Sequence, residues 1–239
     1  MTQSPRAMTT DHSKNQRVRA EQTAIANSDW VVLLHGLFAT RRSMRKLELS
    51  IRDVGYTVLN WGYPTWLRST EQHVRHLLLK VESLQRDPNV RSISFVTHSM
   101  GGILARCALH FGSDAKIKRL VMLAPPNRGS HLTRISLGPF AWFVPAIADL
   151  SESPNSLANR LETTSTVEIG VIAAAHDFIV PVANTQLTNQ SDHCVLSSSH
   201  FRLPSHETAV RYVLSFLQTG QFINTVRDVE DQASKRVAA

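Results

Sequence analysis

The sequence predicts a doubly wound α/β fold, built on a mainly parallel sheet of about six strands. Short apolar runs, typical of strands that are buried on both faces, alternate along the chain with segments of helical spacing. This alternation indicates parallel pairing through right-handed crossovers. The chain has 239 residues, 42% hydrophobic and 19% charged, which is enough for one domain with a substantial core.

The first half of the chain supplies three of these strands, each followed by a helix. The first strand is a continuous apolar run that ends in His35-Gly36. Gly55 ends the helix that follows it, as a glycine at a C-cap does. Ser69 and Gln72 have the spacing of a capping box at the start of the second helix. The predicted strands are 30–34, 56–59 and 93–97, and the predicted helices are 41–54, the segment after Ser69, and 101–111.

The second half continues the alternation but interrupts it once. The interruption, residues 127–166, is about forty residues long, and a structureless loop of that length is uncommon in a compact domain. Because its segment 139–147 is strongly apolar, we expect a short helical cap insertion over the carboxyl edge of the sheet. An extra core helix is the alternative. The remaining predicted elements are strands at 119–123, 167–174 and 193–196 and a last helix that buries Val210, Val213, Leu214 and Leu217 and ends at Gly220.

The predicted folded domain, residues 30–222, lies between two polar ends. Residues 1–29 are expected to form a flexible polar leader and residues 223–239 a charged flexible tail. The leader has no apolar run for a secretory signal, so a cytoplasmic location is the expectation. A transit peptide is the weaker alternative, because Asp11 and Glu21 interrupt the basic leader. Apolar runs are strand-sized and too short to span a membrane.

The formal net charge of +7 does not by itself indicate a nucleic-acid protein. The cations are scattered except for a cluster at Arg41, Arg42, Arg45 and Lys46, and no nucleic-acid motif accompanies them. A solvated helix face is the preferred interpretation, with weak contact to an anionic membrane surface as the alternative. The two cysteines suggest neither a disulfide framework nor a metal site, so no metal or cofactor is expected. The oligomeric state is left open.

Ser99 is the predicted nucleophile, because it stands between a strand and a helix in Thr97-His98-Ser99-Met100-Gly101-Gly102. A serine on a sharp strand-to-helix turn is exposed at the sheet edge, where a base can activate it. Such a turn requires small neighbours, and Gly101 and Gly102 supply them. Thr97 stands where glycine is usual, which is a departure from the common pattern. Helix capping by Ser99 is the bland alternative.

The segment His35-Gly36-Leu37 follows the first strand and predicts an oxyanion hole. Gly36 allows the backbone to turn close to the site. The amides of Leu37 and Met100 are then the two expected donors to a developing oxyanion. His35 itself is expected to be a packed or hydrogen-bonded ring with no catalytic role.

The acid and the base are expected after later strands, in the order Ser, Asp, His. Asp177 follows the strand at 167–174 and would orient an imidazole, whereas Asp192 begins the next strand and is the fallback. His200 lies in the loop before the last helix and is the predicted base. His206 is its rival, but the N-terminus of a helix disfavours the imidazolium that a base becomes.

These segments resemble compact, lipase-like α/β-hydrolases related to the bacterial lipase/esterase and GPI-inositol-deacylase-like families. The resembling segments are 31–37, 60–64, 97–102, 123–130, 177–181 and 199–201. The resemblance implies a compact α/β-hydrolase fold, a triad of Ser99, Asp177 and His200, and hydrolysis of carboxylic esters. It covers residues 30 to about 222 and is loose for substrate, since related proteins cleave esters, thioesters and amides.

The sequence thus predicts a serine esterase or lipase that works through an acyl-enzyme and takes a small-molecule or lipid acyl ester. Phe38, Trp142 and Phe143 are the candidate substrate-binding residues, as apolar side chains near the loop after the first strand and in the cap segment. A thioesterase, amidase or acyltransferase would use the same residues. A catalytically silent binding protein is the alternative from a different class.

Overall fold

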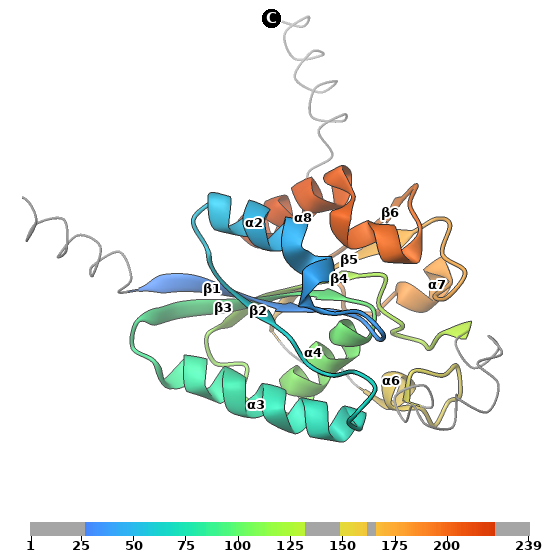
Figure 1. The fold of residues 1–239 in the computed structure, drawn as a ribbon, viewed down its shortest axis with the longest axis horizontal. Coiled ribbons are helices and arrows are strands. Elements are labelled where there is room, and N and C mark those ends of the chain that lie inside the picture. The colour runs from blue at the N-terminus through green and yellow to red at the C-terminus, as the bar shows by residue number, and fades with distance from the viewer. Residues whose placement is uncertain (1–26, 132–148, 162–165, 223–239) are drawn as a thin grey trace, which may run out of the picture.

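The computed structural model describes residues 27–131, 149–161 and 166–222 of the chain. Its centre is one six-stranded sheet in the order β2-β1-β3-β4-β5-β6, in which every neighbouring pair is parallel. The predicted fold class is therefore confirmed (Figure 1). The strands are β1 (Ser28–Leu34), β2 (Thr57–Trp61), β3 (Val90–His98), β4 (Ile117–Leu123), β5 (Glu168–Ala174) and β6 (Asp192–Leu196).

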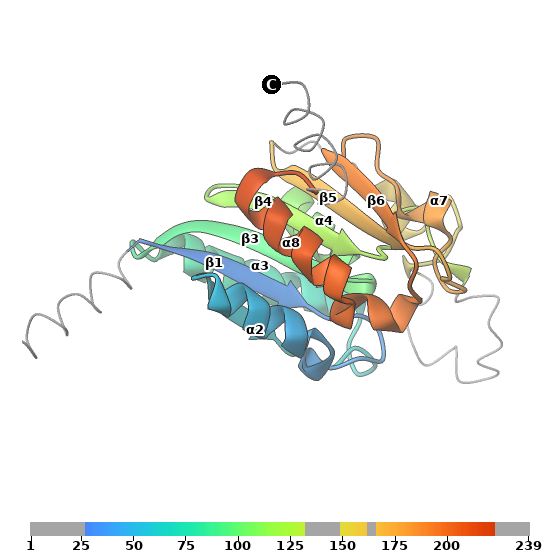
Figure 2. The same ribbon diagram turned by 90° about the horizontal axis from the view of Figure 1, so that it is seen from above.

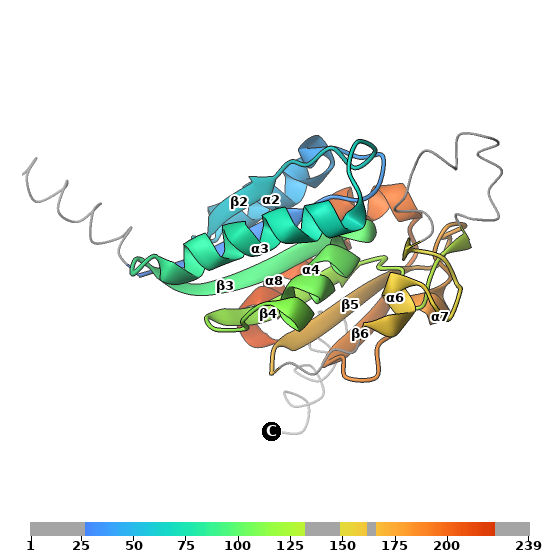
Figure 3. The ribbon, with the colours of Figure 1, turned by 90° about the horizontal axis from the view of Figure 1, so that it is seen from below.

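Helices cover both faces of the sheet, as an all-parallel sheet requires. In Figure 1, α3 (Thr70–Arg86) and α4 (Met100–Phe111) lie below the sheet, and α2 (Arg45–Asp53) and α8 (Glu207–Thr219) lie above it. The views from above and below show each pair in front of the strands (Figures 2 and 3). Each layer has its own apolar core, so the strands are buried on both sides. The short elements are η1 (Arg41–Met44), α6 (Leu157–Arg160), α7 (Val182–Thr185) and η4 (His200–Ser205).

Capping residues begin and end the helices where the sequence predicts. Ser69 and Gln72 form the expected capping box at the start of α3. Gly55 follows α2 with φ of 96° and Gly220 caps α8 with φ of 81°, a left-handed backbone that glycine adopts without strain. The main differences are small: β2 runs two residues further than predicted, and β4 begins at Ile117.

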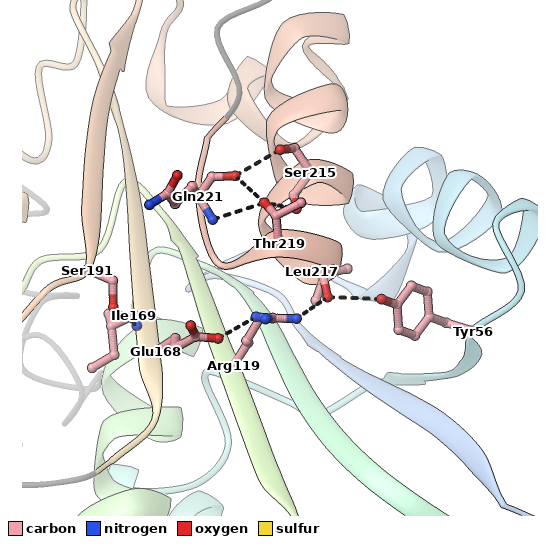
Figure 4. Close-up of polar contacts among 9 residues, drawn as sticks. All are labelled: Tyr56, Arg119, Glu168, Ile169, Ser191, Ser215, Leu217, Thr219 and Gln221. Atoms are coloured by element: carbon pink, nitrogen blue, oxygen red, sulfur yellow. Dashed lines mark hydrogen bonds and ion pairs between the residues drawn. The ribbon is translucent and has the colours of Figure 1, made fainter.

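A buried arginine ties the amino ends of the strands to the last helix. Arg119 of β4 is 6% exposed, and its Nε donates to Glu168 at 2.6 Å while its Nη1 donates to the carbonyl of Leu217 at 2.7 Å. The hydroxyl of Tyr56 donates to the same carbonyl at 2.9 Å (Figure 4). Two donors thus satisfy one carbonyl near the end of α8, where backbone acceptors lack helical partners.

The described parts of the predicted cap, within 127–166, are held by Arg106 of α4. This buried guanidinium donates to the side chain of Asn127 at 3.2 Å and to the carbonyls of Ala158 and Leu161 at 3.2 and 2.6 Å. Burial lowers its pKa to about 10. Trp142 and Phe143 lie outside the described residues, as do the predicted tail and nearly all of the leader. Among the helices that the structure describes, none has the length and apolar character to span a membrane.

Candidate active site

All six strands run in the same direction, so their carboxyl ends meet at one edge of the sheet. The chain leaves β3 at Ser99, β1 at His35 and β6 at Ser197, and these loops converge there. The amino edge, with Arg119 and Tyr56, is at the other end of the strands (Figure 4). The carboxyl edge is therefore the place where the residues that the sequence singles out can meet.

Ser99 joins β3 to α4 with φ of 52° and ψ of −122°. A positive φ is strained for a residue with a Cβ, and surrounding contacts must hold it. The Ser99 amide donates to the carbonyl of Leu123 at 2.9 Å, and the Ser99 carbonyl accepts from the amide of Gly102 at 2.9 Å. This strand-turn-helix geometry is that of a nucleophile elbow.

Gly101 is required by close packing, and Gly102 also lies in a tightly packed position. A Cβ on Gly101 would lie 2.5 Å from the carbonyl oxygen of Leu34, and a Cβ on Gly102 would lie 3.1 Å from the Cβ of Pro125. The unusual Thr97 causes no such conflict. Its side chain is fully buried, and its hydroxyl donates to the carbonyl of Val121 on β4 at 3.3 Å. The sheet therefore accommodates threonine at position 97, where glycine is usual, by burying its side chain and accepting its hydrogen bond.

Gly36 brings the loop after β1 against the turn at Ser99. A Cβ on Gly36 would lie 3.0 Å from the Cβ of Ser99 and 3.0 Å from Nδ1 of His98. Leu37 is the next residue, and Met100 is the residue after Ser99; both side chains are buried. The backbones that carry the two predicted oxyanion donors are thus packed beside the serine.

Tyr63 fixes the loop that carries Leu37. Its ring stacks on His35 with centroids 4.2 Å apart, its amide donates to Nε2 of His35 at 3.3 Å, and its hydroxyl donates to the His35 carbonyl. Burial lowers the pKa of His35, so this ring is a neutral, packed structural group, as expected. One residue past Leu37, the amide of Phe38 donates to the hydroxyl of Thr65 at 3.1 Å.

Asp177 and His200 form a buried pair. Nδ1 of His200 lies 2.7 Å from Oδ2 of Asp177, and their side chains are 6% and 1% exposed. The other oxygen, Oδ1, accepts from the amides of Ile179 and Val180 at 2.9 and 2.8 Å. The carboxylate is thus oriented by its own loop, and it in turn orients the imidazole.

The alternative residues are placed elsewhere. Asp192 begins β6 at the amino edge, and its Oδ2 accepts from the amide of Phe222 at 2.7 Å. His206 is the residue before α8, at the helix N-terminus where it was expected. His176 is exposed, and its Nε2 lies 3.3 Å from the hydroxyl of Ser197. The structure therefore brings His200 together with Asp177 and leaves Asp192 far along the strand.

His98 is a site residue that the sequence analysis did not single out. Its Nε2 lies 3.0 Å from the carbonyl of His200, and the two rings have centroids 4.8 Å apart. Because a carbonyl only accepts, Nε2 carries the proton and donates. Burial, and then the neighbouring His200, lower the pKa of His98 to about 3, which keeps the ring neutral. The position of His98 directly before Ser99 indicated that it lies near the site. The sequence did not indicate that its ring donates to the carbonyl of His200, which is 102 residues away.

Other features of the predicted site have partial outcomes. Phe38 is 51% exposed at this edge, whereas Trp142 and Phe143 lie outside the described residues. In ranges 27–131, 149–161 and 166–222, no three His, Cys, Asp or Glu side chains gather as metal ligands would.

Solved structures with similar folds include lipases and esterases. The mature lipase BlEst2 of Bacillus licheniformis aligns with a TM-score of 0.62 at 15% identity, over 80% of this chain and 91% of its own. Lipase B of Aspergillus fumigatus aligns with a TM-score of 0.68 at 13% identity, over 82% of this chain and 54% of its own. A metagenomic carboxyl esterase gives 0.58 at 18% identity, over 73% and 66%. At these identities the likeness establishes the fold.

Comparison by sequence finds one family and no curated relative. No curated protein sequence matches the chain. A family model described as PGAP1-like alpha/beta domain matches residues 64–213, more than half of the chain, and this range includes Ser99, Asp177 and His200. The predicted family resemblance is therefore confirmed: the chain belongs to the PGAP1-like alpha/beta domain family, with the fold of the α/β-hydrolase superfamily.

Proposed function

We propose that the protein is a serine hydrolase that cleaves carboxylic esters through Ser99, His200 and Asp177. The observation that carries the proposal is the 2.7 Å contact between the buried His200 Nδ1 and Asp177 Oδ2. This contact orients the imidazole of His200. The backbone carbonyl of His200 in turn accepts from His98, the residue before Ser99. A serine, a base and a group that orients the base are the parts that nucleophilic acyl transfer requires.

The chemistry follows from which nitrogen of His200 is engaged. Because Nδ1 faces Asp177, Nε2 is left to take the proton of Ser99 as its oxygen attacks the ester carbonyl. The amides of Leu37 and Met100 stabilise the oxyanion of the tetrahedral intermediate. His200 then gives its proton to the departing alcohol, which leaves an acyl group on Ser99. Water, activated by the same imidazole, releases the acid.

The proposed substrate is an acyl ester with an apolar acyl group, from a small molecule or a lipid. Large apolar side chains at the carboxyl edge support this class: Phe38 is 51% exposed, and Phe201, which contacts the ring of His200 at a centroid distance of 5.2 Å, is 67% exposed. Apolar surface near the reacting group favours an acyl chain over a polar one. The fold of the neighbouring lipases and esterases supports the same class.

The decisive experiment labels the full chain with a fluorophosphonate probe and measures hydrolysis of nitrophenyl esters of increasing acyl length. Ser99→Ala should abolish both labelling and turnover, because the proposal assigns the covalent adduct to the Ser99 oxygen. Ser198→Ala is the matched control, because Ser198 is also buried and lies two residues before His200. This variant should keep both labelling and turnover. Absence of labelling in the wild-type protein would instead favour the binding-protein alternative.

A further inference from the structure

Exposed apolar side chains gather in the loops that leave the carboxyl ends of the strands. Of the ten large hydrophobic residues that are most exposed among the described residues, five belong to these loops, and the other five are scattered over helices and β6. We define the apolar rim as Phe38, Trp66, Leu67, Phe178 and Phe201, which are 51%, 47%, 72%, 86% and 67% exposed.

The rim borders the candidate active site. Phe38 directly follows Leu37, Phe178 directly follows Asp177, and Phe201 directly follows His200. Trp66 and Leu67 join them because the amide of Phe38 donates to Thr65. Every apolar side chain of the rim is thus attached to a residue that forms the site or to the loop that holds it.

The same loops carry an unbalanced positive charge. They contain five exposed arginines, while their one carboxylate, Asp177, is 1% exposed and faces His200. The loops are 35–44, 62–69, 124–131, 175–181 and 197–206, and the arginines are Arg41, Arg42, Arg68, Arg128 and Arg202. The described segment 149–161, which also follows β4, adds Asp149 and Glu152. Glu152 lies 3.2 Å from Nε2 of His131 and accepts from the side chain of Asn184 at 3.0 Å. Where helices start, Glu71 is paired with Arg75, and Glu207 with Lys46.

Most of the other described arginines form ion pairs. Within the described residues, none of the five edge arginines forms an ion pair, but six others do. These six are Arg45, Arg52, Arg75, Arg86, Arg91 and Arg119, each with an Asp or Glu partner. The carboxyl edge therefore presents exposed arginines without ion pairs together with apolar surface.

We propose that the carboxyl edge docks on an anionic lipid surface, with the apolar rim inserted among the acyl chains and the edge arginines on the lipid phosphates. Apolar side chains ringed by basic ones fit an anionic interface, where burial and electrostatic attraction add. In this orientation the edge of the sheet that carries Ser99 faces the lipid. This proposal rests on the proposed function. It adds that the acyl ester substrate is taken from an anionic lipid surface.

The charge contribution is tested by binding of the full chain to vesicles of phosphatidylcholine, with or without an equimolar part of phosphatidylglycerol. Binding to the anionic vesicles should be the tighter and should weaken with salt. Arg42→Gln with Arg202→Gln should weaken it by about thirtyfold, since each arginine contributes about 1 kcal/mol at such a surface. Arg75→Gln with Arg86→Gln removes the same charge from α3 and should have little effect.

The apolar contribution has an equally close control. Leu67→Ser with Phe178→Ser should weaken binding to both kinds of vesicle by at least about tenfold. Leu79→Ser with Phe111→Ser, which changes 60% and 61% exposed side chains on α3 and α4, should not. All four double variants should hydrolyse a water-soluble ester as the wild type does, because none changes a residue of the site.

Three results would overturn the docking proposal: no anionic vesicle binding at low salt, equal losses in the rim and control variants, or rim variants that lose only self-association in sedimentation. Ser99→Ala separates the two proposals. If it binds vesicles as the wild type does but the wild type hydrolyses no ester, docking stands and the proposed function fails. If the wild type hydrolyses soluble esters without binding vesicles, the opposite holds.

Discussion

The imidazole of His98 donates from Nε2 to the carbonyl of His200 at 3.0 Å, so the residue before the candidate nucleophile holds the backbone of the candidate base. His98 is 3% exposed, and its Nδ1 has no hydrogen-bond partner among the described residues. The one hydrogen bond that this buried ring makes therefore joins β3 to the loop after β6. A donor in this position fixes the distance between the two loops that carry Ser99 and His200.

Replacing His98 should affect turnover more than substrate affinity. His98→Leu removes the donor and should lower kcat by about 10- to 100-fold with KM little changed, because a small displacement of a base is costly. His98→Gln keeps a donor at nearly the same reach and should recover part of kcat. Steady-state kinetics on a soluble ester measure both. Equal kcat for the two variants would contradict the positioning role.

The stability of the protein should fall in acid partly because of His98. Its pKa is lowered from 6.5 to about 3, so the unfolded chain takes a proton that the folded chain refuses. The stability it provides is complete above about pH 6.5 and is lost as the pH falls toward 3, by about 1.4 kcal/mol per pH unit. Burial lowers the pKa of His35, His73 and His193 in the same direction.

Urea unfolding between pH 7 and pH 4 measures this slope. The free energy of unfolding of His98→Gln should fall less steeply than that of the wild type, by up to one proton. Parallel curves for wild type and His98→Gln would be inconsistent with a neutral His98.

Asp177→Asn should lower kcat by roughly 10⁴-fold, as loss of the orienting carboxylate does in serine hydrolases. The fold should survive, because an amide oxygen can still accept from Ile179 and Val180. Asp192→Asn is the control, since Asp192 lies at the amino edge and contacts the amide of Phe222. Full activity in Asp177→Asn, or its loss in Asp192→Asn, would reverse the assignment.

Tyr63→Phe and Tyr56→Phe remove the same kind of bond at opposite edges of the sheet. The Tyr63 hydroxyl donates to His35 beside the oxyanion loop, so its loss should lower kcat by about tenfold. The Tyr56 hydroxyl donates to Leu217 at the amino edge, so its loss should lower the free energy of unfolding by about 1 kcal/mol and leave kcat unchanged (Figure 4). A change in kcat for both would show that the two edges are not independent.

Gly101→Ala should destabilise the fold severely, because the new Cβ would lie 2.5 Å from the carbonyl oxygen of Leu34, which is backbone and cannot yield. We expect a loss of about 3 kcal/mol or more, measured by urea unfolding. Gly62→Ala is the control: its Cβ would lie 3.4 Å from the flexible side chain of Arg41. A small effect at Gly101 would mean that β1 and α4 are packed less closely than described.

Much of the fold was predictable from local patterns in the sequence. Apolar runs gave the strands, and the capping pair Ser69 and Gln72 and the glycines 55 and 220 gave helix ends, because each depends on neighbouring residues alone. The order of Ser99, Asp177 and His200 along the chain predicted which residues would meet, and the geometry places Asp177 against His200. The strand ends moved by a few residues, because pairing with neighbouring strands sets them.

The sequence by itself determined the parallel sheet, the strained turn at Ser99 and the loops in which Asp177 and His200 lie, since periodicity and turn chemistry are local properties. Only the tertiary structure decided that His98 holds His200, that Tyr63 fixes the loop of Leu37, and that Thr97 bonds to β4. It also decided that arginines without ion pairs and exposed aromatics share one edge. Each of these relations joins segments that are distant in the chain. They exist because six parallel strands bring their carboxyl ends to one place.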